Sequence, residues 1–202
     1  MLINPIRTSP SLQIVLNNRF KNDSGEDCLV SVDGVDFMIE EPFPYTKDVS
    51  NIWYSQKFHG PGLRYEVGVG IKEGDIVWLQ GPFPAGQHND CTLFQDGLAN
   101  YLDPFERVEA DDGYRAADPE KVKSKSGFSH RYSSEEKLDV KNRVRARHET
   151  VNKRIKQFAS LSSIFCHDLV KHSDFVYVSV VLTQICIEMG EPLFQVDYNN
   201  MP

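Results

Sequence analysis

Residues 28–39 read Cys-Leu-Val-Ser-Val-Asp-Gly-Val-Asp-Phe-Met-Ile, an apolar, β-branched run with a carboxylate near its middle. This composition predicts a buried strand. The dipeptide Asp33-Gly34 leaves a second interpretation open, because Asp-Gly between apolar runs is also typical of a tight hairpin turn. The segment therefore predicts one long strand or two short ones, with Asp33 at the centre in either case.

The rest of the chain alternates between strand-like and helix-like patterns. Apolar residues recur at every second position after residue 63, and Lys72-Glu-Gly74 separates two apolar runs, which predicts a hairpin. The further expected strands are 63–71, 75–80 and 106–110, and the expected helices are 90–102, 133–158 and 174–189. The last helix is apolar on most sides and is expected to be buried, although its β-branched residues also permit a strand. This order predicts an α/β protein with a mixed sheet and flanking helices.

Length and composition set the domain organisation. The 202 residues suit one domain with a proper core, or two very small ones. With 40% hydrophobic and 25% charged residues, the chain is not a disordered polymer, a collagen or a coiled coil. We expect residues 1–27 to form an irregular or helical lead-in and residues 28–198 to form one domain. Residues 115–133 are strongly polar and predict a surface insertion in that domain.

Cysteine spacing and hydropathy bear on location. The four cysteines lie far apart with no C-x-x-C pair, which favours reduced thiols in a reducing compartment. The most apolar run, 175–187, is well short of the roughly 20 residues that a membrane span needs. The start of the chain does not resemble a signal peptide. We therefore expect an intracellular protein without a membrane partner, located in the nucleus if the source is eukaryotic.

The segment from 141 to 156 is strongly basic. It holds seven lysine and arginine residues against the single acid Glu149, although the whole chain has a formal charge of −7. A helical projection puts Glu149 on the face opposite the apolar residues, with Arg145 and Lys156 nearby. The apolar, core-facing residues are Val144, Val151, Ile155 and Phe158. One interpretation is a solvated helix stabilised by i,i+4 ion pairs, each contributing ~0.2–0.5 kcal/mol. The other is a carboxylate that holds a metal ion, among cations that hold a phosphate backbone.

Further carboxylates lie where strands or helices are expected to begin or end. Asp33 lies in the first strand, Asp111 follows the strand at 106–110, and Asp90 begins the helix at 90–102. Each has an ordinary explanation, since Asp is common in turns and at helix N-caps. Short Asp side chains on strands, with a longer Glu on a helix, are also the oxygen ligands that paired Mg²⁺ ions need from rigid elements.

These acids lie in segments that together resemble a known family. The segments are Ser31-Val-Asp-Gly-Val-Asp36, Ala110-Asp-Asp-Gly-Tyr-Arg115 and residues 145–156, where Arg145 precedes Glu149 by four residues and Lys156 follows it by seven. They resemble the DDE superfamily of transposases and endonucleases, specifically the Harbinger-type branch with its DDE Tnp4-like domain. Tyr54-Ser-Gln-Lys57 and Gly86-Gln-His-Asn-Asp90 are similar to that family's lysine and His-Asp segments. The similarity runs from about residue 28 to residue 158 and is expected to continue to residue 198.

The resemblance implies a ribonuclease H-like fold and a transposable-element enzyme that cleaves DNA or transfers a DNA strand. It implies a catalytic, metal-binding triad of Asp33, Asp111 and Glu149, with Asp90 as an additional acid near the site. The implied cofactor is a divalent metal, Mg²⁺ or Mn²⁺, as two ions. The implied partner is DNA, held by the cations Lys57, Arg145, Lys153 and Lys156.

The sequence departs from the family in three ways. Val35 stands where the family usually has Thr, and Asp112 stands where it has Gly or Ser. The residues before Cys28 are too few for the separate N-terminal DNA-binding domain of such transposases, so a separate DNA-binding protein or a homo-oligomer would be a further partner. Two alternatives stay open. One is a catalytically silent, transposase-derived DNA-binding or interaction module. The other is a small-molecule hydrolase with paired carboxylates, such as a glycosidase, which leaves the basic helix unexplained.

Overall fold

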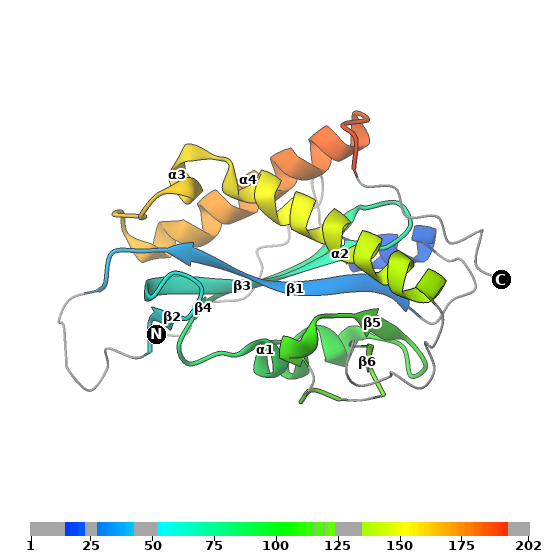
Figure 1. Cartoon of the computed structure of the whole chain (residues 1–202). Coiled ribbons are helices and arrows are strands. Elements are labelled where there is room, and N and C mark those ends of the chain that lie inside the picture. The colour runs from blue at the N-terminus through cyan, green and yellow to red at the C-terminus, as the bar shows by residue number, and fades with distance from the viewer. Residues whose placement is uncertain are drawn as a thin grey trace.

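The first apolar run forms one long strand, β1 (Cys28–Met38), through the middle of the sheet (Figure 1). In this computed structural model, the backbone of Gly34 continues the strand ladder opposite Glu66. A hairpin turn at Asp33-Gly34 is therefore wrong, because the buried residues on both sides extend one strand through it. The structure describes residues 15–22, 28–42, 52–114, 116–118, 120–123 and 135–193.

Strands on both sides of β1 form one mixed, curled sheet. β3 (Gly60–Gly70) pairs antiparallel with β1, and β4 (Ile76–Pro84) pairs antiparallel with β3, so the predicted hairpin is confirmed. On the other side, β5 (Arg107–Glu109) runs parallel to β1, and β6 (Val122–Lys123) runs parallel to β5. The short β2 (Tyr54–Ser55) pairs with the start of β3. The chain is an α/β protein with a mixed sheet, as expected.

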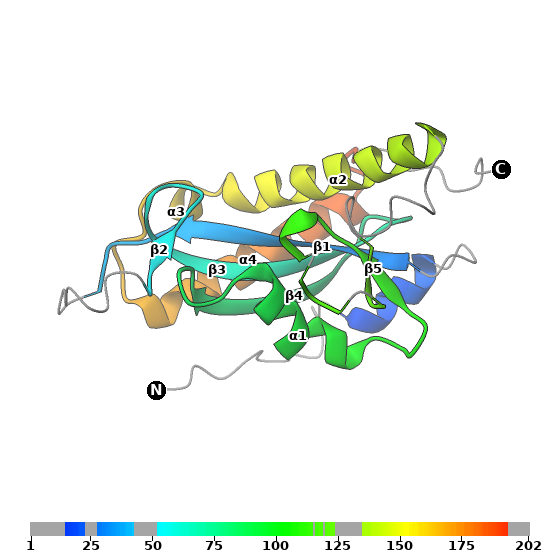
Figure 2. The same cartoon turned by 60° about the horizontal axis from the view of Figure 1, so that its bottom comes forward.

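Helices cover both faces of this sheet (Figures 1 and 2). The helices on one face are α2 (Glu135–Lys156), α3 (Ala159–Ser162) and α4 (Leu169–Glu188), and the helix on the other is α1 (Asp90–Asp96). The short 3-10 helices of the described residues are η1 (Leu16–Asn22), η2 (Leu98–Tyr101) and η3 (Asp112–Tyr114). The helix expected at 90–102 corresponds to α1 followed by η2, and the long basic helix corresponds to α2.

Two apolar cores hold the helices to the sheet. Successive residues of β1 point to opposite faces, so Val35 and Phe37 lie under α2 and α4, whereas Val30 and Val32 lie over α1. The predicted core-facing stripe of α2 is confirmed at its buried residues Val144, Val151 and Ile155. Phe158 is only half-buried, because α2 ends before it. The two cores fix α2 and α1 on opposite sides of β1.

The last helix is longer and more exposed than expected. α4 begins at Leu169, where the Asp168 side chain accepts a hydrogen bond from the backbone N–H of Val170. Val176 is fully buried, whereas Val178 is 54% exposed. Complete burial of this helix is therefore a wrong prediction, because α4 is an outer layer that packs on α2 and β4 through one side. The strand alternative for this segment is wrong as well.

Parts of the sequence predictions lie outside the described residues. These parts are 1–14 and 23–27 of the lead-in, 115, 119 and 124–133 of the insertion, 133–134 of the expected helix 133–158, and 43–51 and 194–198 of the domain. Within the expected insertion, β6 belongs to the sheet, because Val122 is buried opposite Val108 of β5. All four cysteines are free thiols. Among the helices that the structure describes, none has the length and apolar character to span a membrane.

Candidate active site

The parallel pairing of β1 with β5 brings two of the predicted acids together. Ser31 of β1 lies opposite Glu109, the last residue of β5. Paired parallel strands run in the same direction in register, so Asp33 and Asp111, each two residues further along its segment, are neighbours as well. Asp33 is still within β1, whereas Asp111 follows the end of β5 and accepts a hydrogen bond from the Gly113 N–H at 2.7 Å. The sheet therefore supplies two carboxylates at neighbouring positions.

Helix α2 runs across this part of β1 and supplies the third acid. Two hydrogen bonds join the helix to the strand. Ser31 Oγ lies 2.8 Å from His148 Nδ1, and Asn152 Nδ2 donates to Asp33 Oδ2 at 2.9 Å. His148 and Asn152 are about one turn apart on α2 and so face the same side. Glu149 follows His148 and is exposed beside this contact.

The three predicted acids line one pocket with a volume of about 200 Å³. Its charged lining residues are the acids Asp33, Glu109, Asp111 and Glu149 and the cations Lys57, Lys141 and Arg145. Its other lining residues are Ser31, Val32, Ala110, Val144 and His148. The structure therefore brings together carboxylates from a strand, a strand end and a helix, which are far apart in the sequence.

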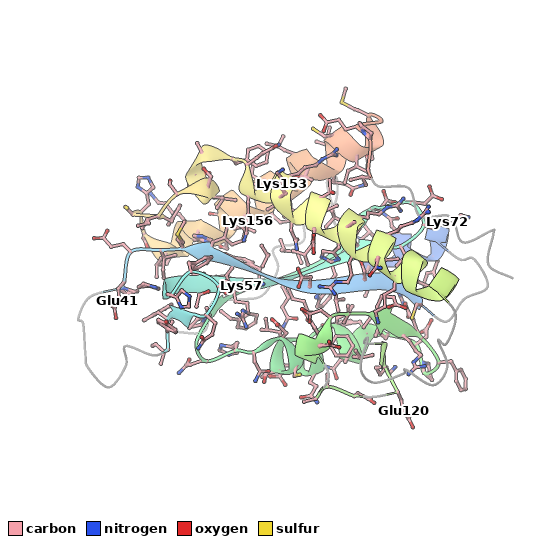
Figure 3. The ribbon with its side chains drawn as sticks, in the orientation of Figure 1. Glu41, Lys57, Lys72, Glu120, Lys153 and Lys156 are labelled. Atoms are coloured by element: carbon pink, nitrogen blue, oxygen red, sulfur yellow. The ribbon has the colours of Figure 1, made fainter. Side chains whose placement is uncertain are left out.

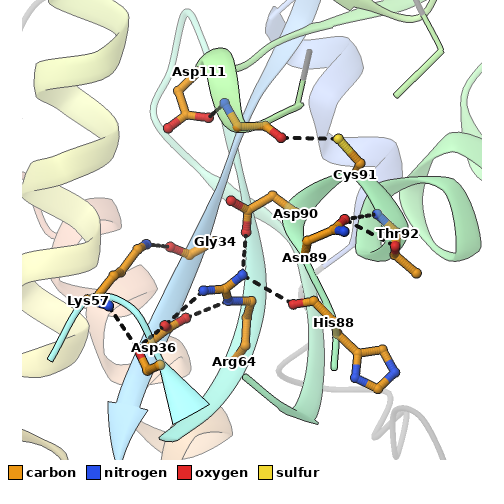
Figure 4. A network of polar contacts seen from close by, with 12 residues as sticks. Gly34, Asp36, Lys57, Arg64, His88, Asn89, Asp90, Cys91, Thr92 and Asp111 are labelled. Atoms are coloured by element: carbon orange, nitrogen blue, oxygen red, sulfur yellow. Dashed lines mark hydrogen bonds and ion pairs between the residues drawn. The ribbon is translucent and has the colours of Figure 1, made fainter. Parts of the chain in front are cut away.

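Lys57 reaches the pocket from the loop after β2. Its Nζ donates a hydrogen bond to the carbonyl oxygen of Gly34, the residue that follows Asp33 (Figure 4). The loop is held in turn by Ser55, whose Oγ accepts from the Lys57 backbone N–H at 3.1 Å and donates to Asp36 Oδ2 at 2.6 Å. The ammonium group thus stands at the acidic pocket.

Behind the pocket, Arg64 of β3 joins two largely buried carboxylates (Figure 4). It donates to Asp36 through Nε at 2.7 Å and Nη2 at 3.0 Å, and its Nη1 lies 3.4 Å from Asp90 Oδ1. Although burial acts to raise it, hydrogen bonds from Arg64 and Ser55 hold the pKa of Asp36 below its ordinary value. Burial raises the pKa of Asp90, although Arg64 and Lys57 oppose this. Arg64 is therefore the internal counterion of this network.

The carboxylate of Asp90 packs against glycines next to the pocket. A Cβ on Gly113 would lie 2.8 Å from Asp111 Oδ1 and 3.0 Å from Asp90 Oδ2, so Gly113 leaves room for both carboxylates. The same Asp90 carboxylate would collide with a Cβ on Gly34. Asp90 is nevertheless absent from the lining of the described pocket and is paired with Arg64. The structure thus places it behind the other three acids.

Electrostatics in the pocket favour a bound cation. Burial raises the pKa of Asp33 to about 6, Lys57 opposes this, and the negative charges of Asp111 and Asp90 add to it. A cation beside Asp33 would favour its ionised form and would offset the repulsion among the carboxylates.

The donor set matches a divalent metal ion in its chemistry. Carboxylate oxygens from rigid elements are the hard ligands that Mg²⁺ and Mn²⁺ take. As placed here, no three His, Cys, Asp or Glu side chains of the described residues form a group that could hold one ion. Binding of an ion would therefore draw the carboxylates of Asp33, Asp111 and Glu149 toward one another.

Of the four cations predicted to hold DNA, Lys57 and Arg145 line the pocket and the other two do not. Lys153 is exposed near the end of α2, away from the pocket lining (Figure 3). Lys156 points its Nζ over the Phe37 ring, 5.7 Å from the ring centroid, and burial lowers the pKa of this lysine. A role of Lys153 or Lys156 in DNA binding stays a prediction.

Sequence reasoning missed several residues that shape the pocket. These are Ser31, Arg64, His148 and Asn152. His148 is 3% exposed, and burial lowers its pKa to about 3, so the imidazole is neutral at neutral pH. The available signal was the position of His148 on the helical projection, next to the buried Ile155. Nothing in the sequence indicated that Arg64 pairs with Asp36.

Comparisons with known proteins were made for the whole chain. No family model, curated protein or solved structure matches it. The resemblance to DDE transposases therefore remains a prediction that rests on the sequence motifs.

Proposed function

We propose that the chain is a metal-dependent phosphodiester hydrolase or strand transferase that acts on DNA, with Asp33, Asp111 and Glu149 as its catalytic acids. The observation that carries the proposal is the shared pocket, in which these three acids stand beside Lys57 and Arg145. A solvated helix with surface ion pairs would not need to present Glu149 to two acids of the sheet. DNA as the substrate accounts for the basic character of α2.

The arrangement of the elements supports a ribonuclease H-like fold as part of this proposal. Three antiparallel strands in the order β4-β3-β1 are followed by α1, by the parallel strands β5 and β6, and then by the long helix α2. That is the succession of hairpin sheet, helix, strand and later helix that the resemblance implies. It also puts one acid on the central strand, one after the next parallel strand and one on the later helix.

The residues of the pocket have distinct roles in this mechanism. Asp33, Asp111 and Glu149 would hold two divalent ions, Mg²⁺ or Mn²⁺. When bound, such ions activate an attacking water or hydroxyl and stabilise the leaving oxygen. Asn152 holds Asp33 in place through its hydrogen bond to Oδ2. Lys57 and Arg145 line the same pocket, and their ammonium and guanidinium groups would bind a phosphate there.

Nicking of supercoiled plasmid DNA tests this proposal. We expect the purified protein to nick DNA in Mg²⁺ or Mn²⁺, and we expect Asp33→Asn to abolish nicking while the protein stays folded by circular dichroism. Asp96→Asn is the matched control, because Asp96 is an exposed residue at the end of α1, away from the pocket, and its loss should leave nicking unchanged. Equal nicking by Asp33→Asn and the wild type would overturn the assignment.

A second candidate function is a transposase-derived DNA-binding module without chemistry. It is favoured by one observation, that no three side chains of the described residues are grouped to hold an ion. Such a module would bind DNA with strong salt dependence but would not cleave it in any divalent ion. Under both candidates, Arg145→Gln should lower the affinity of the protein for DNA. It should also reduce the slope of the logarithm of the DNA-binding constant against the logarithm of salt concentration by about one. Cleavage therefore separates the two, whereas binding does not.

A further inference from the structure

Helix α4 carries a continuous apolar stripe on its exposed side. The residues of the stripe recur at alternating spacings of three and four, which is the heptad pattern of a helix that packs lengthwise against a second helix. They are Phe175, Val178, Leu182 and Ile185 of α4 and Met189 at its C-cap. Ile185 is half-buried, and the other four side chains are between 39% and 82% exposed.

The fold itself uses the other side of the same helix. Val176 and Val180 are fully buried in the core between α4 and the sheet, whereas Val178, which lies between them in the sequence, points away from that core. The stripe is thus separate from the core, on a helix that forms an outer layer of the molecule (Figure 1). Contiguous exposed apolar residues of this kind mark an interaction surface.

The stripe is complementary to itself when two copies of α4 run antiparallel. A two-fold axis at residue 180 places position 178 of one copy opposite position 182 of the other, and position 175 opposite position 185. Each of these four positions is apolar, so every one meets an apolar residue of the other copy.

The charges of α4 favour this arrangement over a parallel one. Lys171 lies near the start of the helix and Glu188 at its end, so the same axis brings each Lys171 beside Glu188 of the other copy. Asp174, the remaining acid of the helix, comes opposite the uncharged Cys186. A parallel pair would instead set Lys171 against Lys171 and Glu188 against Glu188, and such like-charge contacts oppose association.

We propose that the exposed face of α4 is a homodimer interface, in which two copies of the chain pack antiparallel through the apolar stripe. The inference goes beyond the proposed function, because the lining of the described pocket contains no residue of α4. One helix from each copy makes a small interface, so we expect a reversible dimer that forms at micromolar protein concentration.

Sedimentation-velocity ultracentrifugation of the full chain tests the proposal. We expect the wild type to pass from monomer to dimer as its concentration is raised through the micromolar range. Val178→Glu places a charge at the centre of the stripe and should raise the dissociation constant of the dimer at least about tenfold. Val170→Glu is the matched control, because Val170 is 64% exposed on α4 but lies outside the stripe, and it should change the constant less than about threefold.

The two valines are exposed, so both variants should fold, which circular dichroism checks. A wild type that stays monomeric throughout the concentration range would overturn the proposal. A dimer that Val178→Glu leaves intact, or that Val170→Glu weakens equally, would overturn it as well.

Charge reversal tests the antiparallel arrangement. Lys171→Glu should weaken the dimer at least about twofold, because it removes the attraction to Glu188 of the other copy. The double variant Lys171→Glu/Glu188→Lys exchanges the two charges and should restore the wild-type dissociation constant. A double variant that dimerises no better than Lys171→Glu would contradict the antiparallel arrangement.

Discussion

Asp33 carries a carboxyl group whose protonation is coupled to folding. Burial raises its pKa to about 6, from an ordinary value of 3.8. The folded state then binds the proton more tightly than the unfolded state, so this group contributes stability at low pH that is lost as the pH rises through about 6. A bound cation would offset this loss of stability, because it favours the ionised carboxylate.

Replacing Asp33 with Asn tests this coupling. The amide oxygen can still accept the hydrogen bond from Asn152, but it brings no charge into the pocket. We expect Asp33→Asn to raise the melting temperature of the metal-free protein at pH 7.5 and to change it little at pH 4. Thermal melts followed by circular dichroism at both pH values provide the measurement. A variant that is less stable than the wild type at pH 7.5 would show that the Asp33 charge is already compensated without metal.

Arg64 stabilises the buried network behind the pocket by neutralising Asp36. The Asp36 side chain is fully buried, so removal of the guanidinium would leave an uncompensated charge. We expect Arg64→Met to lower the free energy of unfolding by about 3–5 kcal/mol, measured by urea denaturation at neutral pH. The double variant Arg64→Met/Asp36→Leu should recover most of the loss. If it is no more stable than Arg64→Met, the charge pair is not the cause.

At the scale of elements, close packing between β3 and β4 depends on a glycine. A Cβ on Gly68 would lie 2.7 Å from the Trp78 Cβ and 3.2 Å from Val30 Cγ1, whereas the nearest atom to a Cβ on Gly60 is 3.8 Å away. We expect Gly68→Ala to destabilise the protein by about 1–3 kcal/mol in urea denaturation. Gly60→Ala, the control on the same strand, should change stability by no more than about 0.5 kcal/mol. Similar effects of the two substitutions would contradict this account of the sheet packing.

The sequence was sufficient to predict elements with a clear pattern. Helix α2 has buried residues at helical spacing, Val144, Val151 and Ile155, and β3 alternates along its length, so both were predicted. The pattern at Asp33-Gly34 was ambiguous, because a local turn preference competes with a sheet that pairs Gly34 with Glu66. Exposure of α4 depends on which elements cover it, and the composition of the helix does not carry that information.

The site itself was predictable only in part. The spacing of Arg145, Glu149 and Lys156 along a helix indicated a carboxylate among cations, and the structure places Glu149 at a pocket with Asp33 and Asp111. The contacts of Ser31 with His148 and of Arg64 with Asp36 join positions 117 and 28 residues apart. Such contacts follow from the sheet register and the crossing of α2, which local sequence patterns do not specify.

At the scale of the whole molecule, the sheet and α2 bring acids from three distant segments to one pocket of about 200 Å³. The lining of the pocket holds four acids together with the cations Lys57, Lys141 and Arg145. This distribution suits a metal ion between carboxylates and a phosphate at the cations. We therefore propose that a divalent ion binds in the pocket that Asp33, Asp111 and Glu149 line.

A crystal grown with Mn²⁺ tests this claim most directly, because anomalous scattering locates the ion independently of any activity. We predict an anomalous peak in the pocket, in contact with an oxygen of Asp33 and with at least one oxygen of Asp111 or Glu149. A pocket that stays empty at saturating Mn²⁺, or an ion bound only at other residues, would contradict the account.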